Sequence, residues 1–392
     1  MKYILMNKNT EVLVAEYNTV LKGFEQIVEY KNMEYAPVII RDLFYNNENV
    51  LTNLSDWFRS RGIPNHRDNL QTLLIRLNIT MPAELLDKAS GLSLSDQYWI
   101  KPYDSDIEYK DINFFENDFD DIEFTEATFS NVGKSTSEAS LKTPNNTTDG
   151  MLKKSWIIKN GKKYLLKGGF HNELLQPFNE VLASMICERL GFSHVTYTLD
   201  IIKDKVVSSC ECFINSNTEY IPAYQILNII EKKYSIEDYK NYIKVLREKG
   251  IKESDKKTDN MFILDYLMLN SDRHLNNFGI IRDVNTLEWL DIAPIFDTGM
   301  ALSVASYDDE EIVIDGGGKF FYNDIRLEDI IKYITNLKRL DLSKLDGVVE
   351  DFDDLLHEYQ HITHFSDKYI NKLCILLNSR IKNLKEIKVR KY

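Results

Sequence analysis

Residues 261–269 constrain the fold of this chain more than any other segment. Their side chains are apolar at almost every position, with Asp265 as the single acid. Because the segment is hydrophobic on nearly all sides, we predict a buried helix rather than a surface one. A buried helix is a rigid support, and this one leads directly into the polar run Asn270-Ser271-Asp272-Arg273-His274-Leu275-Asn276-Asn277. We therefore expect a functional loop at its end.

The polar run carries an acid and an amide five residues apart, Asp272 and Asn277, and a second acid, Asp297, follows in a Phe-Asp-Thr-Gly segment. These are the groups that hold metal-bound nucleotide phosphates. Asp272 can orient and deprotonate an attacking hydroxyl. Asn277 and Asp297 offer the oxygen ligands that Mg²⁺ prefers. The pattern predicts a kinase that uses ATP and Mg²⁺ as cofactors.

A surface loop with an ordinary salt bridge is the alternative interpretation of the Asp-Arg-His run. The buried helix before it, the spacing to Asn277 and the later Asp297 all disfavour that alternative. A hairpin of 278–281 and 287–290, around a polar turn at 282–286, is expected to return the chain. That hairpin should bring Asp297 close to Asn277, which is the geometry that two metal ligands need.

Composition narrows the class of protein. The 392 residues suggest two or three domains. A net charge of -13 disfavours nucleic acid as a direct partner, whereas ATP stays compatible because Mg²⁺ compensates its charge. The 4 cysteines are too few and scattered for a disulfide scaffold, so we expect reduced thiols in a cytoplasmic protein. No apolar run approaches the roughly 20 residues that span a bilayer, so we expect no membrane span.

We predict three domains: an N-terminal accessory or interaction domain at 1–130, a nucleotide-binding kinase small lobe at 131–215, and a helical C-lobe at 216–392. Acids crowd between residues 104 and 126, and a solvated connector is a better interpretation than a binding surface. Residues 130–140 are rich in Ser, Thr and Gly, which is typical of a linker.

The first 130 residues are expected to mix short strands with helices, including helical pieces at 76–88 and 93–100 that Pro82 and Gly91 interrupt. The nearby run Gly133-Lys134-Ser135-Thr136 imitates the end of a P-loop. The earlier glycine that a P-loop requires is replaced by Thr128, so we predict no P-loop here.

A β-hairpin is predicted around Asn160-Gly161, because this dipeptide between two apolar runs favours a type I′ turn. Counting outward from the turn pairs Trp156 with Leu165 and places Lys167 on the same face as Leu165. Lys167 would then project beside an aromatic side chain, which suits a lysine that contacts phosphates.

The loop at 144–150 precedes this hairpin and can cover the phosphates. Its backbone N–H groups, the hydroxyls of Thr147 and Thr148, and the following Asp149 and Gly150 are the candidate contacts. The loop has a single glycine, and an ordinary surface turn is the alternative.

A helix is predicted at 176–190, with proline near its start and glycine just after its end. Glu180 lies off the apolar stripe of this helix, among small side chains that allow close packing. We expect Glu180 to form an ion pair with Lys167, and the alternative is a glutamate that faces solvent.

Two further strands are expected at 197–202 and 206–213. The segment Glu211-Cys212-Phe213 follows them in the position of a connector between lobes. Its order along the chain predicts that Glu211 and Phe213 hold the adenine.

These residues resemble the HipA family of bacterial kinases over about 138–300. Asn270, Asp272, His274 and Asn277 are similar to its catalytic signature, and Ala293-Pro294-Ile295-Phe296-Asp297 to its second metal-binding segment. Lys167 and the pair Asn179-Glu180 are similar to its nucleotide lysine and helix glutamate. The resemblance implies an α+β, bilobal protein-kinase-like fold with a small β-rich lobe, a helical C-lobe and an N-terminal extra domain.

The resemblance also implies roles. Asp272 would be the catalytic base with His274 and Asn277 beside it, Asn277 and Asp297 would bind Mg²⁺, and Lys167 would hold the ATP phosphates. The family phosphorylates Ser or Thr of proteins, often as toxins, which implies a protein substrate and an antitoxin-like or regulatory partner. It can also autophosphorylate in the phosphate loop, which here implies Thr147, Thr148 or a nearby Ser. The family's glycine- and serine-containing loop pattern is replaced at 144–150. We expect a cytoplasmic protein of a bacterium or phage.

Two alternatives stay open. The Asp-Arg-His run with Asn277 is also similar to the catalytic loop of phosphatidylinositol kinases, which would imply a lipid or small-molecule kinase. The unusual loop at 144–150 and the size of the region 1–130 would suit a nucleotide-binding regulator without catalysis. The retention of Lys167, Glu180 and the acid–amide loop argues against the regulator.

Overall fold

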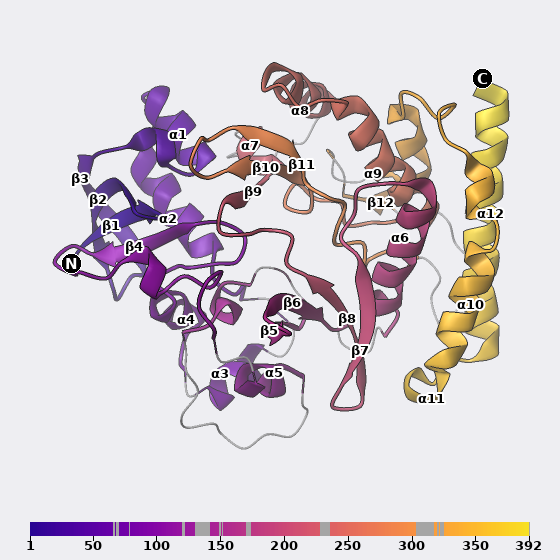
Figure 1. Ribbon diagram of the computed structural model, residues 1–392, viewed down its shortest axis with the longest axis horizontal. Coiled ribbons are helices and arrows are strands. Elements are labelled where there is room, and N and C mark those ends of the chain that lie inside the picture. Colours follow the sequence, from indigo (N-terminus) through magenta and orange to yellow (C-terminus); the bar gives the residue numbers. More distant parts are fainter. Residues whose placement is uncertain are drawn as a thin grey trace. The chain divides into compact units, whose positions relative to one another are not determined.

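The chain contains both helices and strands and is α+β (Figure 1). It divides into two compact units. The computed structural model describes all residues except 66, 68–69, 78, 120–121, 130–141, 149, 151, 170–173, 228–235, 303–316, 320, 322–324 and 392. The first unit consists of residues 1–171, 211–221 and 281–288. The second unit consists of residues 172–210, 222–280 and 289–392.

The two units do not coincide with the three predicted domains. The first unit joins the region 1–130 to the beginning of the predicted small lobe, and most of the rest of that lobe belongs to the second unit. The three-domain boundaries therefore stay a prediction. The linker predicted at 130–140 lies outside the described residues.

An antiparallel sheet in the order β3-β2-β1-β4 organises the start of the first unit. Its strands are β1 (Lys2–Asn7), β2 (Thr10–Asn18), β3 (Gly23–Tyr30) and β4 (Tyr98–Pro102). The α-helices of this unit are α1 (Val38–Tyr45), α2 (Val50–Ser60), α3 (Leu70–Arg76), α4 (Pro82–Lys88) and α5 (Ile122–Phe129). Helices α1 and α2 lie beside the sheet, with α2 packed on β3.

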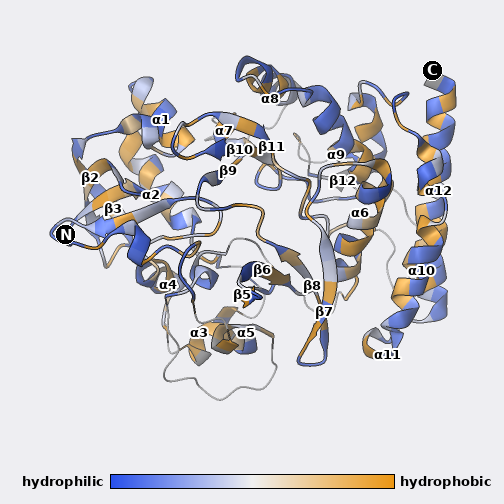
Figure 2. Ribbon diagram, in the orientation of Figure 1, coloured by the Kyte–Doolittle hydropathy of each residue, from blue (hydrophilic) through white to orange (hydrophobic). Residues whose placement is uncertain are grey.

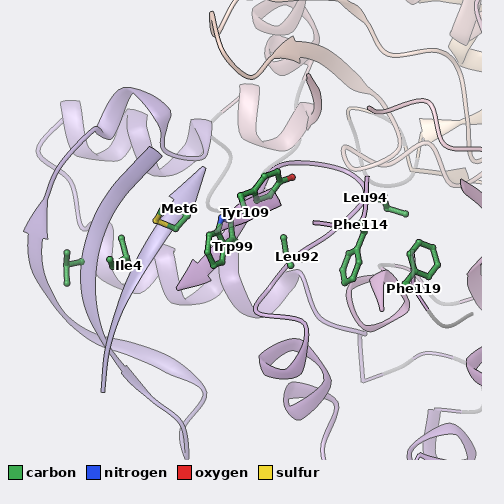
Figure 3. Packing of buried hydrophobic residues seen from close by; sticks show 9 residues of the cluster. Ile4, Met6, Leu92, Leu94, Trp99, Tyr109, Phe114 and Phe119 are labelled. Atoms are coloured by element: carbon green, nitrogen blue, oxygen red, sulfur yellow. The ribbon is translucent and has the colours of Figure 1, made fainter. Parts of the chain in front are cut away.

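Aromatic and aliphatic side chains from β1, β2, β4 and the segments next to β4 form a core of the first unit (Figure 3). The side chains drawn there include Ile4, Met6, Leu92, Leu94, Trp99, Tyr109, Phe114 and Phe119. Phe114 and Phe119 come from the acidic stretch at 104–126, and their rings meet edge to face at 5.8 Å. Burial of these two phenylalanines ties the acidic stretch to the core.

The helix expected at 93–100 is wrong, because β4 occupies the end of this segment. Trp99 pairs with Met6 of β1. The Trp99 side chain is 2% exposed and donates a 2.8 Å hydrogen bond from Nε1 to the carbonyl of Lys8. Burial against a neighbouring strand therefore outweighs the local helical preference.

The helix expected at 76–88 is only partly correct. Helix α3 ends at Arg76, and α4 begins at Pro82. Proline suits the first position of a helix, where its missing N–H is not needed, so it starts α4 rather than interrupting a longer helix.

The predicted hairpin around Asn160-Gly161 is confirmed. Strands β5 (Lys154–Lys159) and β6 (Lys162–Lys167) are antiparallel, and Trp156 pairs with Leu165. Asn160 and Gly161 have φ values of 54° and 74°, as both central residues of a type I′ turn require. Lys167 ends β6 opposite Lys154.

Helix α9 (Ser254–Met268) is the centre of the second unit and confirms the predicted buried helix. Every side chain from Met261 to Leu269 is at most 5% exposed. The helix packs against α6 (Gln176–Leu190), α8 (Ile236–Glu248), α12 (Asp367–Lys391) and the 3₁₀ helix at Leu327–Tyr333. Elements on several sides explain why nearly all positions of this segment are apolar.

The remaining helices of the second unit are α7 (Ala223–Ile226), α10 (Val348–Glu358) and α11 (Gln360–Thr363). Helix α6 has the predicted bounds and ends at Gly191 with a φ of 70°. Hydrophobic and hydrophilic residues alternate along α10 and α12, as in helices that bury one face (Figure 2). In the described part of the chain, no helix is long and apolar enough to span a bilayer.

Strands β7 (Tyr197–Ile202) and β8 (Lys205–Glu211) form an antiparallel hairpin close to the predicted bounds. The other strands are β9 (Thr218–Pro222), β10 (Gly279–Asp283), β11 (Trp289–Ile292), β12 (Gly317–Gly318) and β13 (Ile325–Arg326). The predicted hairpin after Asn277 is thus present as β10 and β11.

The polar turn predicted at 282–286 is wrong at its first residue. Arg282 lies in β10 with a fully buried side chain. Its guanidinium forms an ion pair with Glu219, at 2.6 Å from Nη2 to Oε1, and donates to the Tyr98 hydroxyl at 3.1 Å. A buried partner far away in sequence, which no local pattern reveals, moves this arginine out of the turn and into the core of the first unit.

Replacing the buried acid should destabilise the protein. Glu219→Gln leaves the Arg282 guanidinium buried without its counter-charge, so we expect the free energy of unfolding to fall by roughly 3 kcal/mol. Chemical denaturation measures this change. The control is Glu248→Gln, because Glu248 and Lys244 form an exposed pair on α8, and such pairs contribute about 1 kcal/mol or less. Equal small effects of both substitutions would contradict the expectation.

Candidate active site

The loop after α9 is fixed to the helix by Asp265 and Asn270. Leu269 caps the helix with a left-handed φ of 51°. The amide of Asn270 donates a 2.8 Å hydrogen bond to Oδ1 of Asp265, and its Oδ1 accepts from the backbone N–H of Asp272 at 3.3 Å. The buried helix therefore sets the position of Asp272 through a short chain of hydrogen bonds.

Arg273 connects three segments of the second unit. Its fully buried guanidinium donates to both carboxylate oxygens of Asp265, from Nε at 3.0 Å and from Nη2 at 2.9 Å. Nη1 donates to the carbonyls of Asn277, at 3.0 Å, and Phe296, at 2.5 Å. One side chain thus holds α9, the loop of Asp272 and Asn277, and the residue before Asp297.

The ion pair with Asp265 keeps the Arg273 guanidinium protonated. Burial acts to lower its pKa, but the charge of Asp265 and the hydrogen bonds to it outweigh burial, so the pKa of Arg273 is raised above its ordinary value. A permanently charged donor with several N–H groups suits a position that is surrounded by several acceptors.

Asp272 is the partly exposed acid at the end of this support. Its side chain is 29% exposed, and its Oδ1 is 2.9 Å from Nζ of Lys319. Nε2 of His274 lies 3.8 Å from Oδ2. The amide of Asn277 donates to the Asp272 carbonyl at 3.0 Å, which leaves Oδ1 as the atom of that amide suited to a cation. The predicted catalytic residues Asp272, His274 and Asn277 are therefore together on one loop.

Asp297 has a strained backbone, with a left-handed φ of 56°. Non-glycine residues are rare in this conformation, and such strain often occurs at functional sites. The backbone N–H of Asp297 donates to the hydroxyl of Tyr197 at 3.4 Å. Burial of the Tyr197 phenol, followed by the charge of Glu180, raises its pKa well above the ordinary value. Tyr197 therefore stays a neutral hydroxyl beside this acid.

Helix α6 holds the segment that follows Asp297. Asn179 donates from Nδ2 to the carbonyls of Gly299, at 2.9 Å, and Ala301, at 2.5 Å. Glu180 is 1% exposed, and its Oε2 accepts from the backbone N–H of Thr298 at 3.1 Å and from its hydroxyl at 3.2 Å. The alternative of a solvent-facing Glu180 is therefore wrong, because small neighbours on α6 let the carboxylate pack inward.

Lys167 belongs to the first unit, where its side chain is 3% exposed. Glu180 belongs to the second unit. Their ion pair stays a prediction.

The hydroxyls of Thr147 and Thr148 are buried in the first unit. Residues Pro144–Thr147 form a 3₁₀ helix. The Thr147 hydroxyl donates to the Leu92 carbonyl at 2.6 Å. The Thr148 hydroxyl donates to the Asn145 carbonyl at 3.0 Å and accepts from Nη1 of Arg67 at 2.7 Å. The structure therefore describes a packed segment rather than an exposed surface turn.

The other predicted nucleotide contacts lie in the first unit as well. Glu211 is exposed and pairs with Lys162 at 2.9 Å. The ring of Phe213 meets Tyr220 edge to face at 6.0 Å. Gly150 has a φ of 97°, and Asp149 lies outside the described residues. The contacts of these residues with a nucleotide stay predictions.

Sequence reasoning did not find several supporting residues. Arg273, Asn179, Tyr197 and Lys319 all contact the segments of Asp272 or Asp297, but none was predicted to do so. One signal was available: Asp265 is the single acid in an otherwise apolar helix, and a buried acid requires a buried partner.

Weakening the Arg273 bridge should loosen both loops. Arg273→Lys keeps the charge but cannot reach two carboxylate oxygens and two carbonyls at once. We expect backbone amides in 270–277 and 296–302 to exchange hydrogen about tenfold faster. Hydrogen exchange read by mass spectrometry tests this, with Arg247→Lys as the control because Arg247 pairs with Asp255 at the surface. Unchanged exchange in both segments would show that the bridge does not hold them.

The region that contains these residues is similar to known proteins. The model of the HipA-like C-terminal domain family matches residues 135–334, just over half of the chain. The serine/threonine-protein kinase CtkA of Helicobacter pylori is 33% identical over 150 residues, which cover 36% of this chain and 46% of CtkA. The chain thus spans about half the length of this curated relative.

Two solved structures are similar as well. A chain of the Shewanella oneidensis MR-1 complex of HipA, HipB and operator DNA has a TM-score of 0.58 at 14% identity, covering 98% of this chain and 99% of that one. This similarity shows that the chain shares the fold of that protein. The crystal structure of Helicobacter pylori CtkA has a TM-score of 0.43 at 20% identity, covering 60% of this chain and 94% of that one.

The family match contains the region 138–300 that resembled HipA kinases, and it includes Lys167, Glu180, Asp272, Asn277 and Asp297. The similar solved chain extends over almost the whole length, which accounts for the N-terminal region as part of the same fold. The chain belongs to the HipA-like kinase family and has its α+β fold.

Proposed function

We propose that this chain is an ATP- and Mg²⁺-dependent serine/threonine protein kinase of HipA-like type, with Asp272 as the base. One observation carries the proposal. The Arg273 guanidinium donates to the carbonyls of both Asn277 and Phe296. The loop that carries Asp272 and Asn277 therefore lies next to the segment that carries Asp297. Phosphoryl transfer requires a base and metal ligands on neighbouring loops, and Asp272, Asn277 and Asp297 are side chains of those types.

The donor set suits Mg²⁺. Asn277 offers an amide oxygen and Asp297 a carboxylate, and Mg²⁺ commonly takes one or two carboxylates and completes its shell with water and phosphate oxygens. Held by Asn277 and Asp297, the ion would supply positive charge that offsets the negative charge developing on the phosphate oxygens. Lys167 would hold the phosphates with the backbone of 144–150, and Glu211 and Phe213 would hold the adenine.

The residues of the chain have distinct tasks in this mechanism. Asp272 accepts the proton of the attacking hydroxyl and orients it, and its partial exposure leaves room for a substrate. Arg273 keeps the two loops at a constant separation. Asn179 and Glu180 hold the segment after Asp297, and so support the left-handed backbone of Asp297.

The partners are proposed from relatives and composition. CtkA is named a serine/threonine-protein kinase, which favours a protein substrate with a Ser or Thr acceptor. The Shewanella structure contains HipA with HipB, which favours an antitoxin-like or regulatory protein partner here. A net charge of -13 disfavours direct nucleic-acid contact. The cytoplasm is the proposed location.

Removal of the base or of the metal carboxylate should abolish transfer. We expect Asp272→Asn and Asp297→Asn each to lower the rate of phosphate transfer from Mg-ATP by about a thousandfold. Asp272→Asn removes the general base, whose contribution is on this scale. Asp297→Asn removes the carboxylate that would hold Mg²⁺ and, with it, the charge stabilisation that the ion supplies. Intact-mass spectrometry and transfer to casein measure the rate. Asp354→Asn is the control, since Asp354 is exposed on α10. Full activity of either active-site variant would refute the assigned roles.

Peptide mapping of wild-type protein after incubation with Mg-ATP tests self-phosphorylation. Phosphate on Thr147 or Thr148 is the expected result, and it should be absent in Asp272→Asn. Both hydroxyls are bound to protein carbonyls, so the segment must open before either hydroxyl can react. Phosphate only at other positions would exclude the 144–150 segment as the acceptor.

The Mg²⁺ dependence of nucleotide binding distinguishes the proposed metal ligands, Asn277 and Asp297, from the proposed base, Asp272. With Mg-ADP, we expect the thermal unfolding temperature of the wild type and of Asp272→Asn to rise by several degrees, on the order of the shift that about 1–2 kcal/mol of binding produces. EDTA should remove the shift. Asn277→Ala and Asp297→Asn should show little shift with or without Mg²⁺. An undiminished Mg²⁺-dependent shift in both would exclude them as ligands.

A further inference from the structure

Residues Gly317, Gly318 and Lys319 lie against the loop of the proposed base, and the mechanism above does not use them. Strand β12 (Gly317–Gly318) pairs with β13 (Ile325–Arg326), which leads into the 3₁₀ helix that packs on α9. The glycine-rich run begins at Gly316, which lies outside the described residues. The short strand is thus anchored to the same buried helix that supports Asp272.

Gly318 permits a close approach of backbone to backbone. A Cβ atom at this position would lie 2.7 Å from Cδ2 of Leu327 and 3.3 Å from Cα of Ser271. The contact with Leu327 is closer than real Cβ atoms allow, and that with the Ser271 backbone is tight. A side chain here would require the Leu327 side chain to move and would press on the Ser271 backbone, so glycine favours the close approach of the strand to the loop.

Lys319 is held by its backbone as well as by its side chain. Its N–H donates to the Ser271 carbonyl at 2.8 Å, and the residue forms an isolated parallel bridge with Asp272. Its ammonium then reaches Oδ1 of Asp272 at 2.9 Å. The backbone contacts of Lys319 therefore position its ammonium beside the Asp272 carboxylate.

Stability does not explain this ion pair. The Lys319 side chain is 57% exposed and Asp272 is 29% exposed. Pairs this exposed contribute about 1 kcal/mol or less. The pair also places a lysine at the one acid that must face a substrate, and the ammonium can change partner because much of it faces solvent.

The loop itself offers little positive charge for a phosphoryl group. Between Asp272 and Asn277 the sequence contains no lysine. Arg273 is fully buried, with its donors directed to Asp265 and to two carbonyls. His274 is the other basic side chain, and it is charged only when protonated. Phosphoryl transfer develops negative charge on the transferring group, which a positioned cation stabilises.

We propose that Lys319 is a further catalytic residue, whose ammonium, held beside Asp272, donates hydrogen bonds to the γ-phosphoryl oxygens during transfer. This inference rests on the proposed kinase function. The substrate oxygen bonds to the γ-phosphorus while the bond to the bridging oxygen breaks, and that electron pair leaves with ADP. The hydroxyl proton passes to Asp272 and then to solvent. Lys319 keeps its proton throughout.

The test compares Lys319→Gln and Lys319→Arg with Lys332→Gln. Lys332 is an exposed lysine of the same unit that pairs with Asp329. Turnover of Mg-ATP is measured as transfer to casein plus release of phosphate. We expect Lys319→Gln to lower kcat about 100-fold with a KM for ATP within about threefold of wild type. Lys319→Arg should recover part of the loss, and Lys332→Gln should match wild type.

A second readout reports the transition state without an acceptor substrate. Wild-type protein should bind Mg-ADP more tightly when aluminium fluoride mimics the transferring phosphoryl group. Lys319→Gln should lose this gain and keep its affinity for Mg-ADP alone. A purely structural role would lower both affinities together and would overturn the proposal.

The outcomes separate the two proposals. An inactive wild type without any gain from aluminium fluoride would overturn the kinase function and, with it, the role of Lys319. An active wild type with unchanged kcat in Lys319→Gln would overturn the role of Lys319 alone. A higher kcat in that variant would also overturn it, because the lysine would then obstruct the base.

Discussion

The ion pair of Asp265 and Arg273 is the interaction on which the second unit depends. Burying either charge alone would be costly, and the cost is offset only because the guanidinium meets both carboxylate oxygens and two further carbonyls. Neither partner can shift without leaving the other unpaired. The pair therefore fixes the loop of Asp272 and the segment before Asp297 to the buried helix α9.

Support from α6 complements this pair. Asp297 has a left-handed backbone, which costs free energy that neighbouring contacts must offset. Asn179 and Glu180 supply such contacts by binding the backbone just after it. Gly318 allows Lys319 to reach Asp272 from a third segment. The acids thus belong to a site whose strain and charge are balanced by side chains from distant parts of the sequence.

Two predictions that depend on neighbouring residues alone were accurate. The turn at Asn160-Gly161 depends on the freedom of those two residues to adopt positive φ, and the helix at 176–190 on apolar spacing and its terminal glycine. Predictions failed where a distant partner decided the outcome. Trp99 is in a strand because it pairs with Met6, and Arg282 left its predicted turn because Glu219 is buried beside it.

Short-range patterns were sufficient to predict a kinase-like site and its family: an acid and an amide at a defined spacing, a second acid, and a buried helix before them. These features depend on residue types and on contacts within a few positions. The tertiary structure decided which charged side chains form ion pairs. Arg273 and Asp265 are 8 positions apart in the sequence, and Lys319 and Asp272 are 47 positions apart. Such partners meet only after the intervening elements have packed, and no local pattern records that arrangement.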